Sequence, residues 1–135
     1  MTLLHRTRLS LLMLATAVLA GCAAPAPPAP PPTGLAEVME RPAERALLEG
    51  IRAYDDGQYA QAEKALRKAL GDGLQSTRDR ATAHKLLAFI TCTSNRLADC
   101  QTQFREARAA DASFALSRSE AGHPVWGPVY RSLSQ

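Results

Sequence analysis

The sequence predicts an all-α domain built from two helical hairpins and a C-terminal capping segment. Apolar residues make up 46% of the chain, but aromatic residues only 5%, and alanine supplies much of the remainder. Small side chains allow helices to approach closely, so this composition favours helix-on-helix packing. Apolar residues also recur at spacings of three and four in four successive segments, which is the helical period. We expect a signal peptide and a proline-rich linker before this domain.

Residues 1–21 have the features of an export signal. Arg6 and Arg8 give a positive start, and residues 9–21 follow without a charge. An apolar run of about 13 residues is too short to span a hydrocarbon core of roughly 30 Å, but it fits a secretory signal peptide. An ordinary signal peptide with an incidental cysteine after it is the alternative to the more specific interpretation that follows.

Leu19, Ala20, Gly21 and Cys22 resemble the lipobox of bacterial lipoproteins at all four positions. The resemblance implies that the Cys22 sulfur takes a diacylglycerol, that the preceding bond is cut, and that the new amine receives a further acyl chain such as palmitate. Several acyl chains anchor a protein stably, at about 0.8 kcal/mol per buried CH₂. Ala23 stands where enteric-type sorting places aspartate for inner-membrane retention, so we expect the outer membrane, periplasmic face.

Residues 22–34 predict a spacer. Six of the eight residues from Pro25 to Pro32 are proline, which lacks an amide donor and excludes helix and sheet. At about 3.1 Å per residue in polyproline II, the stretch holds the following domain up to roughly 35 Å from the lipid. A ligand for a proline-reading module is the alternative.

Residues 35–135 form the predicted domain. Pro42 suits a helical first turn, and a helix runs from it to a break at residues 55–58. A second helix from Tyr59 stops at the glycines of residues 71–73. Ser76 and Thr77 can cap a third helix, Asn95 lies at the turn after it, and a fourth helix ends near Asp111.

The two hairpins form an internal repeat. EGIRAYDDGQYAQAEKALRKAL and LAFITCTSNRLADCQTQFREAR align at a constant offset of 38 residues. Small Gly50, turn residue Gly57 and small Ala62 of the first copy resemble the tetratricopeptide repeat (TPR), whose usual period is 34. A generic four-helix bundle is the alternative. Because about three repeats make a self-sufficient stack, another segment should cap this one.

After lipidation of Cys22, Cys92 and Cys100 remain. They lie almost symmetrically about the turn of the second hairpin, where antiparallel helices bring Cα atoms to about 6 Å. An oxidising periplasm favours a disulfide, which would contribute roughly 2–3 kcal/mol in the chain-entropy model. Two reduced, buried cysteines are the alternative.

The C-terminal segment FALSRSEAGHPVWGPVYRSL departs from the repeat. We expect it to fold back over the hairpins as the missing cap, or to form a partner-binding patch, since tryptophan and tyrosine concentrate binding energy at interfaces. In TPR proteins the first helix of each hairpin lines a concave groove for peptides. The resemblance therefore implies a candidate partner-binding set, to which the C-terminal aromatics are added: Leu47, Ile51, Tyr54, Lys85, Phe89, Trp126 and Tyr130.

Composition and motifs argue against other classes of function. Without Arg6 and Arg8, 16 − 2 = 14 basic residues face 13 acidic ones, too balanced for a nucleic-acid footprint. His84 and His123 stand alone, without a metal-ligand motif. Phosphate loops and nucleophile motifs are absent. We expect no enzyme activity, metal, cofactor, nucleic acid or small-molecule substrate.

Several stretches together resemble the TssQ family of lipoproteins associated with type VI secretion. They are the lipobox, the linker, KALRKALGDGL, KLLAFITC with a second cysteine eight residues later, QFREA, and EAGHPVWGPVYRS. The resemblance covers nearly the whole mature chain and implies an accessory role at the secretion machine, with a protein partner in the cell envelope. A general envelope-assembly lipoprotein, acting as a scaffold for outer-membrane, pilus or cell-wall assembly, is the alternative.

Overall fold

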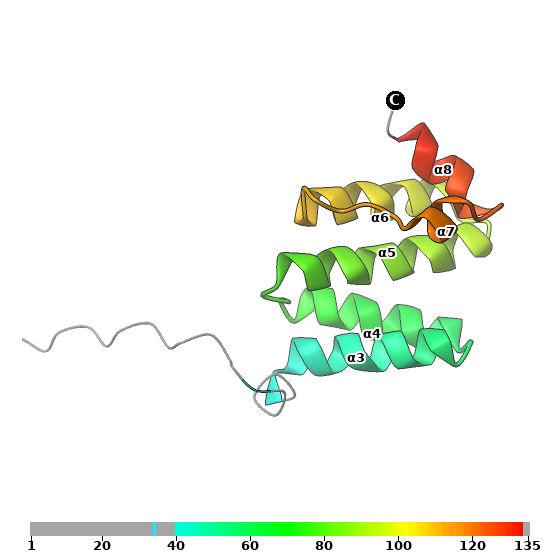
Figure 1. The fold of residues 1–135 in the computed structure, drawn as a ribbon. Coiled ribbons are helices and arrows are strands. Elements are labelled where there is room, and N and C mark those ends of the chain that lie inside the picture. The colour runs from blue at the N-terminus through cyan, green and yellow to red at the C-terminus, as the bar shows by residue number, and fades with distance from the viewer. Residues whose placement is uncertain (1–33, 35–39, 134–135) are drawn as a thin grey trace, which may run out of the picture. The chain divides into compact units, whose positions relative to one another are not determined.

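Two antiparallel helical hairpins stack side by side, and a C-terminal segment packs against the second (Figure 1). The computed structural model describes residue 34 and residues 40–133. In these residues α3 (Pro42–Asp55) pairs with α4 (Tyr59–Gly71), and α5 (Thr77–Thr93) pairs with α6 (Leu97–Ala110). The predicted all-α, TPR-like fold is therefore confirmed. The predicted signal peptide, Cys22 and the linker through residue 33 lie outside the described residues.

The helix boundaries follow the start and stop residues of the sequence. Pro42 opens α3, where its missing amide hydrogen costs nothing because the first helical amides have no intrahelical acceptor. The Ser76 hydroxyl caps α5 by accepting a hydrogen bond of 3.1 Å from the Asp79 amide. This is the cap that the sequence predicts.

The two hairpin turns have the same backbone geometry. Gly57 and Asn95 occupy equivalent repeat positions, and their φ angles of 72° and 57° lie in the left-handed region. Glycine and asparagine tolerate this region best. The following amides also match: Gln58 N donates to Ala53 O, and Arg96 N donates to Thr91 O, both at 2.8 Å. The 38-residue offset therefore describes two copies of one local structure.

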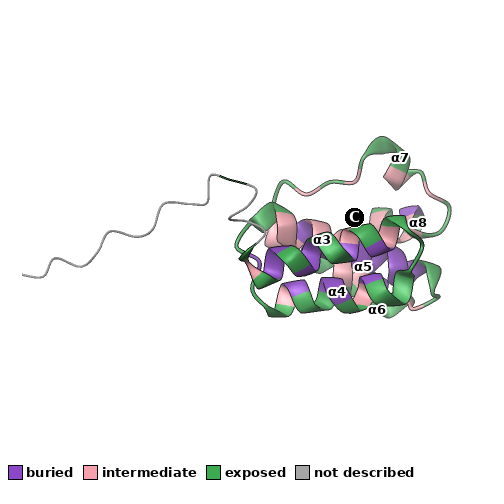
Figure 2. Cartoon of the chain, turned by 90° about the horizontal axis from the view of Figure 1, so that it is seen from below, coloured by how far each residue is buried: buried purple, intermediate pink, exposed green. Residues whose placement is uncertain are grey.

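The core lies between the facing helices and repeats in the same way (Figure 2). Leu66 of the first hairpin and Phe104 of the second are equivalent and both fully buried. Close packing depends on small partners, because a Cβ added to Gly50 would lie 2.7 Å from Leu66 Cγ. Two further pairs of equivalent positions have no exposed surface, and all four hold small residues: Ala62 with Cys100, and Ala69 with Ala107.

The C-terminal segment forms two short helices that pack against each other, and α8 also contacts α5 and α6. They are α7 (Arg118–Ala121) and α8 (Trp126–Ser132), and the first turn of α8 holds Gly127 and Pro128. A capping box begins α7: Ser117 Oγ accepts from Glu120 N, and Glu120 Oε2 accepts from Ser117 N. The segment thus folds back onto the hairpins, as predicted.

Candidate functional site

Residues 111–133, here called the C-terminal strap, cross the second hairpin with Trp126 facing α5. The indole ring stacks on the Phe89 ring with 4.2 Å between ring centroids and 19° between planes. Its Nε1 donates a 2.9 Å hydrogen bond to the Glu120 carbonyl oxygen, so both the apolar face and the polar edge of the indole have partners. The His123 ring also stacks on the indole.

Lys85 of α5 binds the strap beside this stack. Its Nζ lies 2.7 Å from Glu120 Oε1, and both side chains are about one-quarter exposed. Partial burial opposes ionisation of Glu120, but the hydrogen bonds from Lys85 and Ser117 outweigh it, so the pKa of Glu120 is lowered. The carboxylate that pairs with Lys85, a candidate partner-binding residue, thus belongs to the chain itself.

Tyr130 makes the second attachment of the strap. Its ring packs edge-on against Phe104, with centroids 5.2 Å apart, and its hydroxyl accepts from Leu116 N at 3.3 Å. Arg108 lies over the same ring, with Cζ 4.8 Å from the centroid, and donates to the Leu133 carbonyl oxygen at 2.9 Å. The strap is therefore fixed at both α5 and α6.

All seven aromatic residues of the chain belong to one connected network. Its outer part, here called the aromatic face, consists of Tyr59, Tyr54, Phe89, Trp126 and His123, in order of contact. Burial is the main cause that raises the pKa of Tyr54, and the charges of Tyr59, Asp55 and Glu120 add to it. The face therefore joins the first hairpin to the strap.

The predicted partner-binding residues do not form one open groove. Leu47 and Phe89 are buried, at 5% and 4% exposure. Ile51, Tyr54, Lys85, Trp126 and Tyr130 are partly buried, and the last three are engaged within the chain. The strap thus covers Phe89 and engages Lys85, which the resemblance placed on the groove.

Two residues of the site were not predicted. Tyr59, which the sequence places only at the start of the second helix, is 51% exposed at the end of the aromatic face. Glu120 holds Lys85 and the strap together. The spacing Ser117-x-x-Glu120 is a capping-box pattern and could have identified the second.

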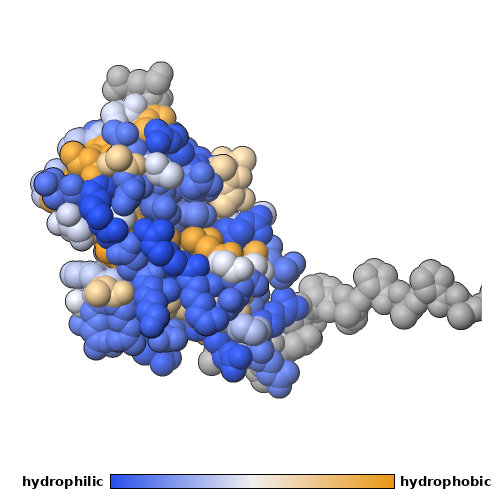
Figure 3. Space-filling view, turned by 180° about the vertical axis from the view of Figure 1, so that it is seen from behind, coloured by the Kyte–Doolittle hydropathy of each residue, from blue (hydrophilic) through white to orange (hydrophobic). Residues whose placement is uncertain are grey.

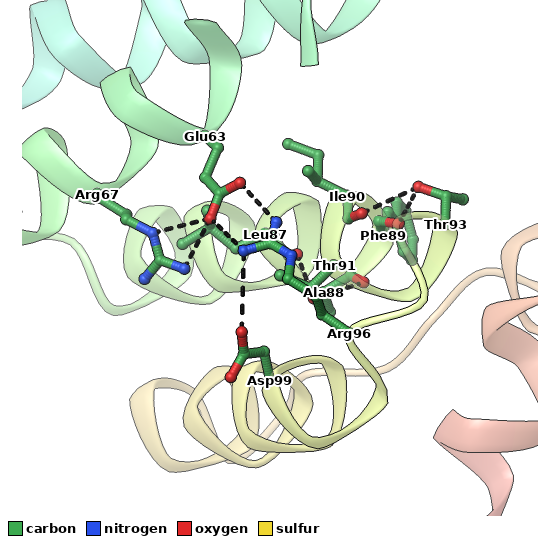
Figure 4. Close-up of polar contacts among 10 residues, drawn as sticks. All are labelled: Glu63, Arg67, Leu87, Ala88, Phe89, Ile90, Thr91, Thr93, Arg96 and Asp99. Carbon is green, nitrogen blue, oxygen red and sulfur yellow. Dashed lines mark hydrogen bonds and ion pairs between the residues drawn. The ribbon is translucent and has the colours of Figure 1, made fainter. Parts of the chain in front are cut away.

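The second hairpin is closed by a disulfide between Cys92 and Cys100, whose Cα atoms lie 5.1 Å apart. Both side chains are buried. The closed loop carries Arg96, which reaches across to Glu63 of α4 (Figure 4). Here the second hairpin binds the first by an ion pair rather than by apolar packing alone.

Exposed apolar surface is limited among the described residues. The large apolar side chains most exposed there are Leu48, Tyr59, Leu97 and Val125. On the face seen in Figure 3, apolar residues form small patches on a mostly hydrophilic surface. A broad preformed docking area is not visible on that face, whereas a stable interface usually buries about 800 Å² on each partner.

Other types of site find little support in the described residues. No group of three or more histidine, cysteine, aspartate or glutamate side chains there could hold a metal ion. An open pocket of about 390 Å³ lies between α5 and the start of the strap. Its Asp111 carboxylate is held by the Ser113 amide and hydroxyl at 2.8 and 2.7 Å. In residues 40–133, no helix is both long and apolar enough to cross a membrane.

No family model, curated protein or solved structure matches this chain.

Proposed function

We propose that this chain is a lipid-anchored, periplasm-facing, TPR-like protein-interaction module, and that it serves the type VI secretion system as an accessory component. Cys22 attaches it to the outer membrane through acyl chains, and residues 23–34 hold the helical domain away from the lipid. The role is one of binding and includes no catalytic step, metal or cofactor.

One observation in the folded domain supports the proposed interaction role. The two most specific stretches of the TssQ resemblance, KLLAFITC at residues 85–92 and GHPVWGPVY at residues 122–130, meet at one place. Phe89 of the first stacks on Trp126 of the second, and the Lys85–Glu120 ion pair lies beside them. Residues that are distant in sequence thus build one aromatic face, and aromatic side chains are enriched at binding interfaces.

The proposal is tested in cells. A photo-crosslinking residue at position 59, where the side chain is half exposed, should capture a periplasmic component of the secretion machine. The matched control is position 105 on α6, which is exposed but outside the aromatic face. Deletion of the gene should lower secretion, and the full chain should restore it. Normal secretion in the deletion strain, with only background capture at position 59, would contradict the proposal.

The genomic neighbourhood separates this role from general envelope assembly. Neighbouring sheath and baseplate genes support the secretion role. Pilus, outer-membrane or cell-wall assembly genes support the scaffold alternative, in which the same aromatic face serves a different machine. Capture of an assembly factor at position 59 would also support the scaffold alternative.

A further inference from the structure

The strap lies on α5 in the manner of a bound peptide. Two of its side-chain contacts with that helix are an ion pair and a ring stack: Glu120 on Lys85, and Trp126 on Phe89. The two α5 residues are four apart, so they lie on the same side of the helix. The two strap residues are six apart and bridged by the hydrogen bond from the indole to the Glu120 carbonyl. The strap therefore shows which chemistry this surface of α5 accepts.

The strap is bound much less deeply than the hairpins. Among residues 111–133, Gly127 alone is buried, whereas the second hairpin alone holds Phe104, Cys100 and Leu87 almost without exposure. The glutamate–lysine pair is one-quarter exposed on both sides, and ion pairs near solvent contribute little, about 0–1 kcal/mol. Segments with few buried contacts open at a lower free energy than the core. The strap should therefore open without unfolding of the hairpins.

The surface beneath the strap contains the buried ring of Phe89 and the ammonium group of Lys85. Opening uncovers Phe89 and frees Lys85, and Tyr54 and Tyr59 continue the same face outward. The resulting site offers one ammonium group beside a row of rings. An incoming carboxylate and aromatic ring would replace the two contacts that Glu120 and Trp126 make with α5, so these two contacts are exchanged rather than lost.

We propose that the Lys85 and Phe89 side of α5 binds a partner protein segment in which an acidic residue is followed six residues later by a large aromatic residue, and that the strap occupies this site until the partner displaces it. The inference rests on the proposed interaction role and adds the chemistry of the partner. The expected segment is short and helical or turned, as residues 117–130 are, and it carries its negative charge on the N-terminal side of the ring.

Trp126 makes displacement directly measurable, because it is the chain's only tryptophan. The probe is a synthetic peptide of residues 117–131 with phenylalanine at position 126, titrated into the purified full chain in detergent. Displacement moves Trp126 from its stack into water, so its emission should shift to longer wavelength and saturate. A control peptide with Glu120→Gln, and alanine at position 126, should leave the emission unchanged. An unchanged emission with the probe peptide at millimolar concentration overturns the proposal.

A second measurement uses protein variants and a fluorescein-labelled form of the same peptide. Glu120→Gln with Trp126→Ala weakens the strap and leaves α5 intact, so the site is open in a larger fraction of molecules. The apparent affinity rises in proportion to that fraction, and we expect it to be about tenfold tighter than in the wild type. Adding Lys85→Met should weaken binding about fivefold or more, whereas Val125→Ala, at an exposed strap position, should resemble the wild type.

Equal affinity of the wild type and the weakened-strap variant would exclude occupancy by the strap. Binding that is insensitive to Lys85→Met would exclude the proposed carboxylate contact. If the weakened-strap variant loses helix content in circular dichroism, the wild-type emission experiment decides alone. The role in secretion is tested separately: crosslinking at position 59 with a secretion defect, but no peptide response, supports the proposed function and rejects this inference.

Discussion

Glu63 of the first hairpin and Arg96 of the second form a two-pronged ion pair across the hairpin boundary. Arg96 Nη2 lies 2.6 Å from Glu63 Oε2, and Nη1 lies 3.0 Å from Oε1. Arg67 donates to the same carboxylate from one turn further along α4, at 2.8 and 3.1 Å. Hydrogen bonds with charged groups in this forked geometry are stronger and more directional than neutral ones. The pair therefore fixes how one hairpin sits against the next.

This ion pair predicts an acid-dependent loss of stability. The hydrogen bond from Arg96, opposed by partial burial and assisted by Arg67, lowers the pKa of Glu63 from 4.5 to about 2. Because the folded-state value is the lower one, the stabilisation is fully present above pH 4.5 and is lost as the pH falls toward 2. Glu63→Gln should cost about 1–3 kcal/mol at pH 7 and little at pH 2. Denaturant titrations across this pH range measure it.

The control for this prediction is Glu49→Gln, which removes an exposed glutamate with no ion pair among the described residues. It should leave the free energy of unfolding within about 0.5 kcal/mol of the wild type at both pH values. An equal loss in the two variants, or a Glu63→Gln loss that persists at pH 2, would show that the ion pair does not account for the pH dependence.

Gly50→Ala should destabilise the first hairpin although alanine is the better helix former. The added methyl group would lie 2.7 and 2.8 Å from Leu66 side-chain carbons and 3.2 Å from the Leu66 backbone nitrogen. Leu66 is fully buried, so it has no free space to move into. Overpacking of this kind costs about 1–3 kcal/mol, against a helix-propensity gain of up to about 1 kcal/mol. Thermal unfolding followed by circular dichroism measures the net effect.

Gly71→Ala is the matched control for Gly50→Ala. It lies at the end of α4 with nothing within 4 Å of an added Cβ, so only the helix-propensity term applies. We expect no loss of stability, or a gain of a few tenths of a kcal/mol. A Gly50→Ala variant as stable as Gly71→Ala would mean that the two helices of the hairpin can separate slightly without cost.

The hairpins could be predicted from the sequence because their determinants are local and occur twice. Gly57 and Asn95, and Leu66 and Phe104, occupy equivalent places in sequence and in structure. The site was harder to predict, because Glu120 and Trp126, the partners of Lys85 and Phe89, lie 35 and 37 residues further along the chain. They also belong to a segment that is not part of the repeat. Periodicity shows that Phe89 is on the apolar side of its helix, but not that this chain's own Trp126 covers it.

The disulfide between Cys92 and Cys100 predicts a stability that depends on the redox state. Closing a loop of this length should contribute about 2–3 kcal/mol through the unfolded state, so dithiothreitol should lower the denaturation midpoint of the wild type. The variant with Cys92→Ala and Cys100→Ala should have the denaturation midpoint of the reduced wild type, and dithiothreitol should not change it. Mass spectrometry of alkylated protein, with and without reduction, identifies the bond. Full alkylation of both cysteines without reductant would contradict the pairing.

Trp126→Ala should release the strap while the hairpins stay folded. The substitution removes the stack on Phe89 and the indole hydrogen bond to Glu120, and we expect a cost of about 1–3 kcal/mol for these half-buried contacts. Arg118 and Arg131 lie in the strap and are exposed, so trypsin should cut there faster than in the wild type. Val125→Ala should keep the wild-type rate. Equal cleavage of all three proteins would show that Trp126 does not hold the strap.

If Cys22 carries the proposed acyl chains, Cys22→Ser should abolish acylation and leave the protein without its lipid anchor. The hydroxyl is a weaker nucleophile than a thiol and cannot replace it as the acceptor for the diacylglycerol, so the variant should carry none of the proposed acyl chains. Fractionation of cells and [³H]palmitate labelling measure the change, and density-gradient separation of the membranes tests the outer-membrane assignment. Because the substitution lies outside residues 42–132, which hold the described helices, the variant should keep the wild-type circular dichroism spectrum. Full activity in secretion with all of the variant in the soluble fraction would separate the module's function from its anchoring and leave the linker without a role.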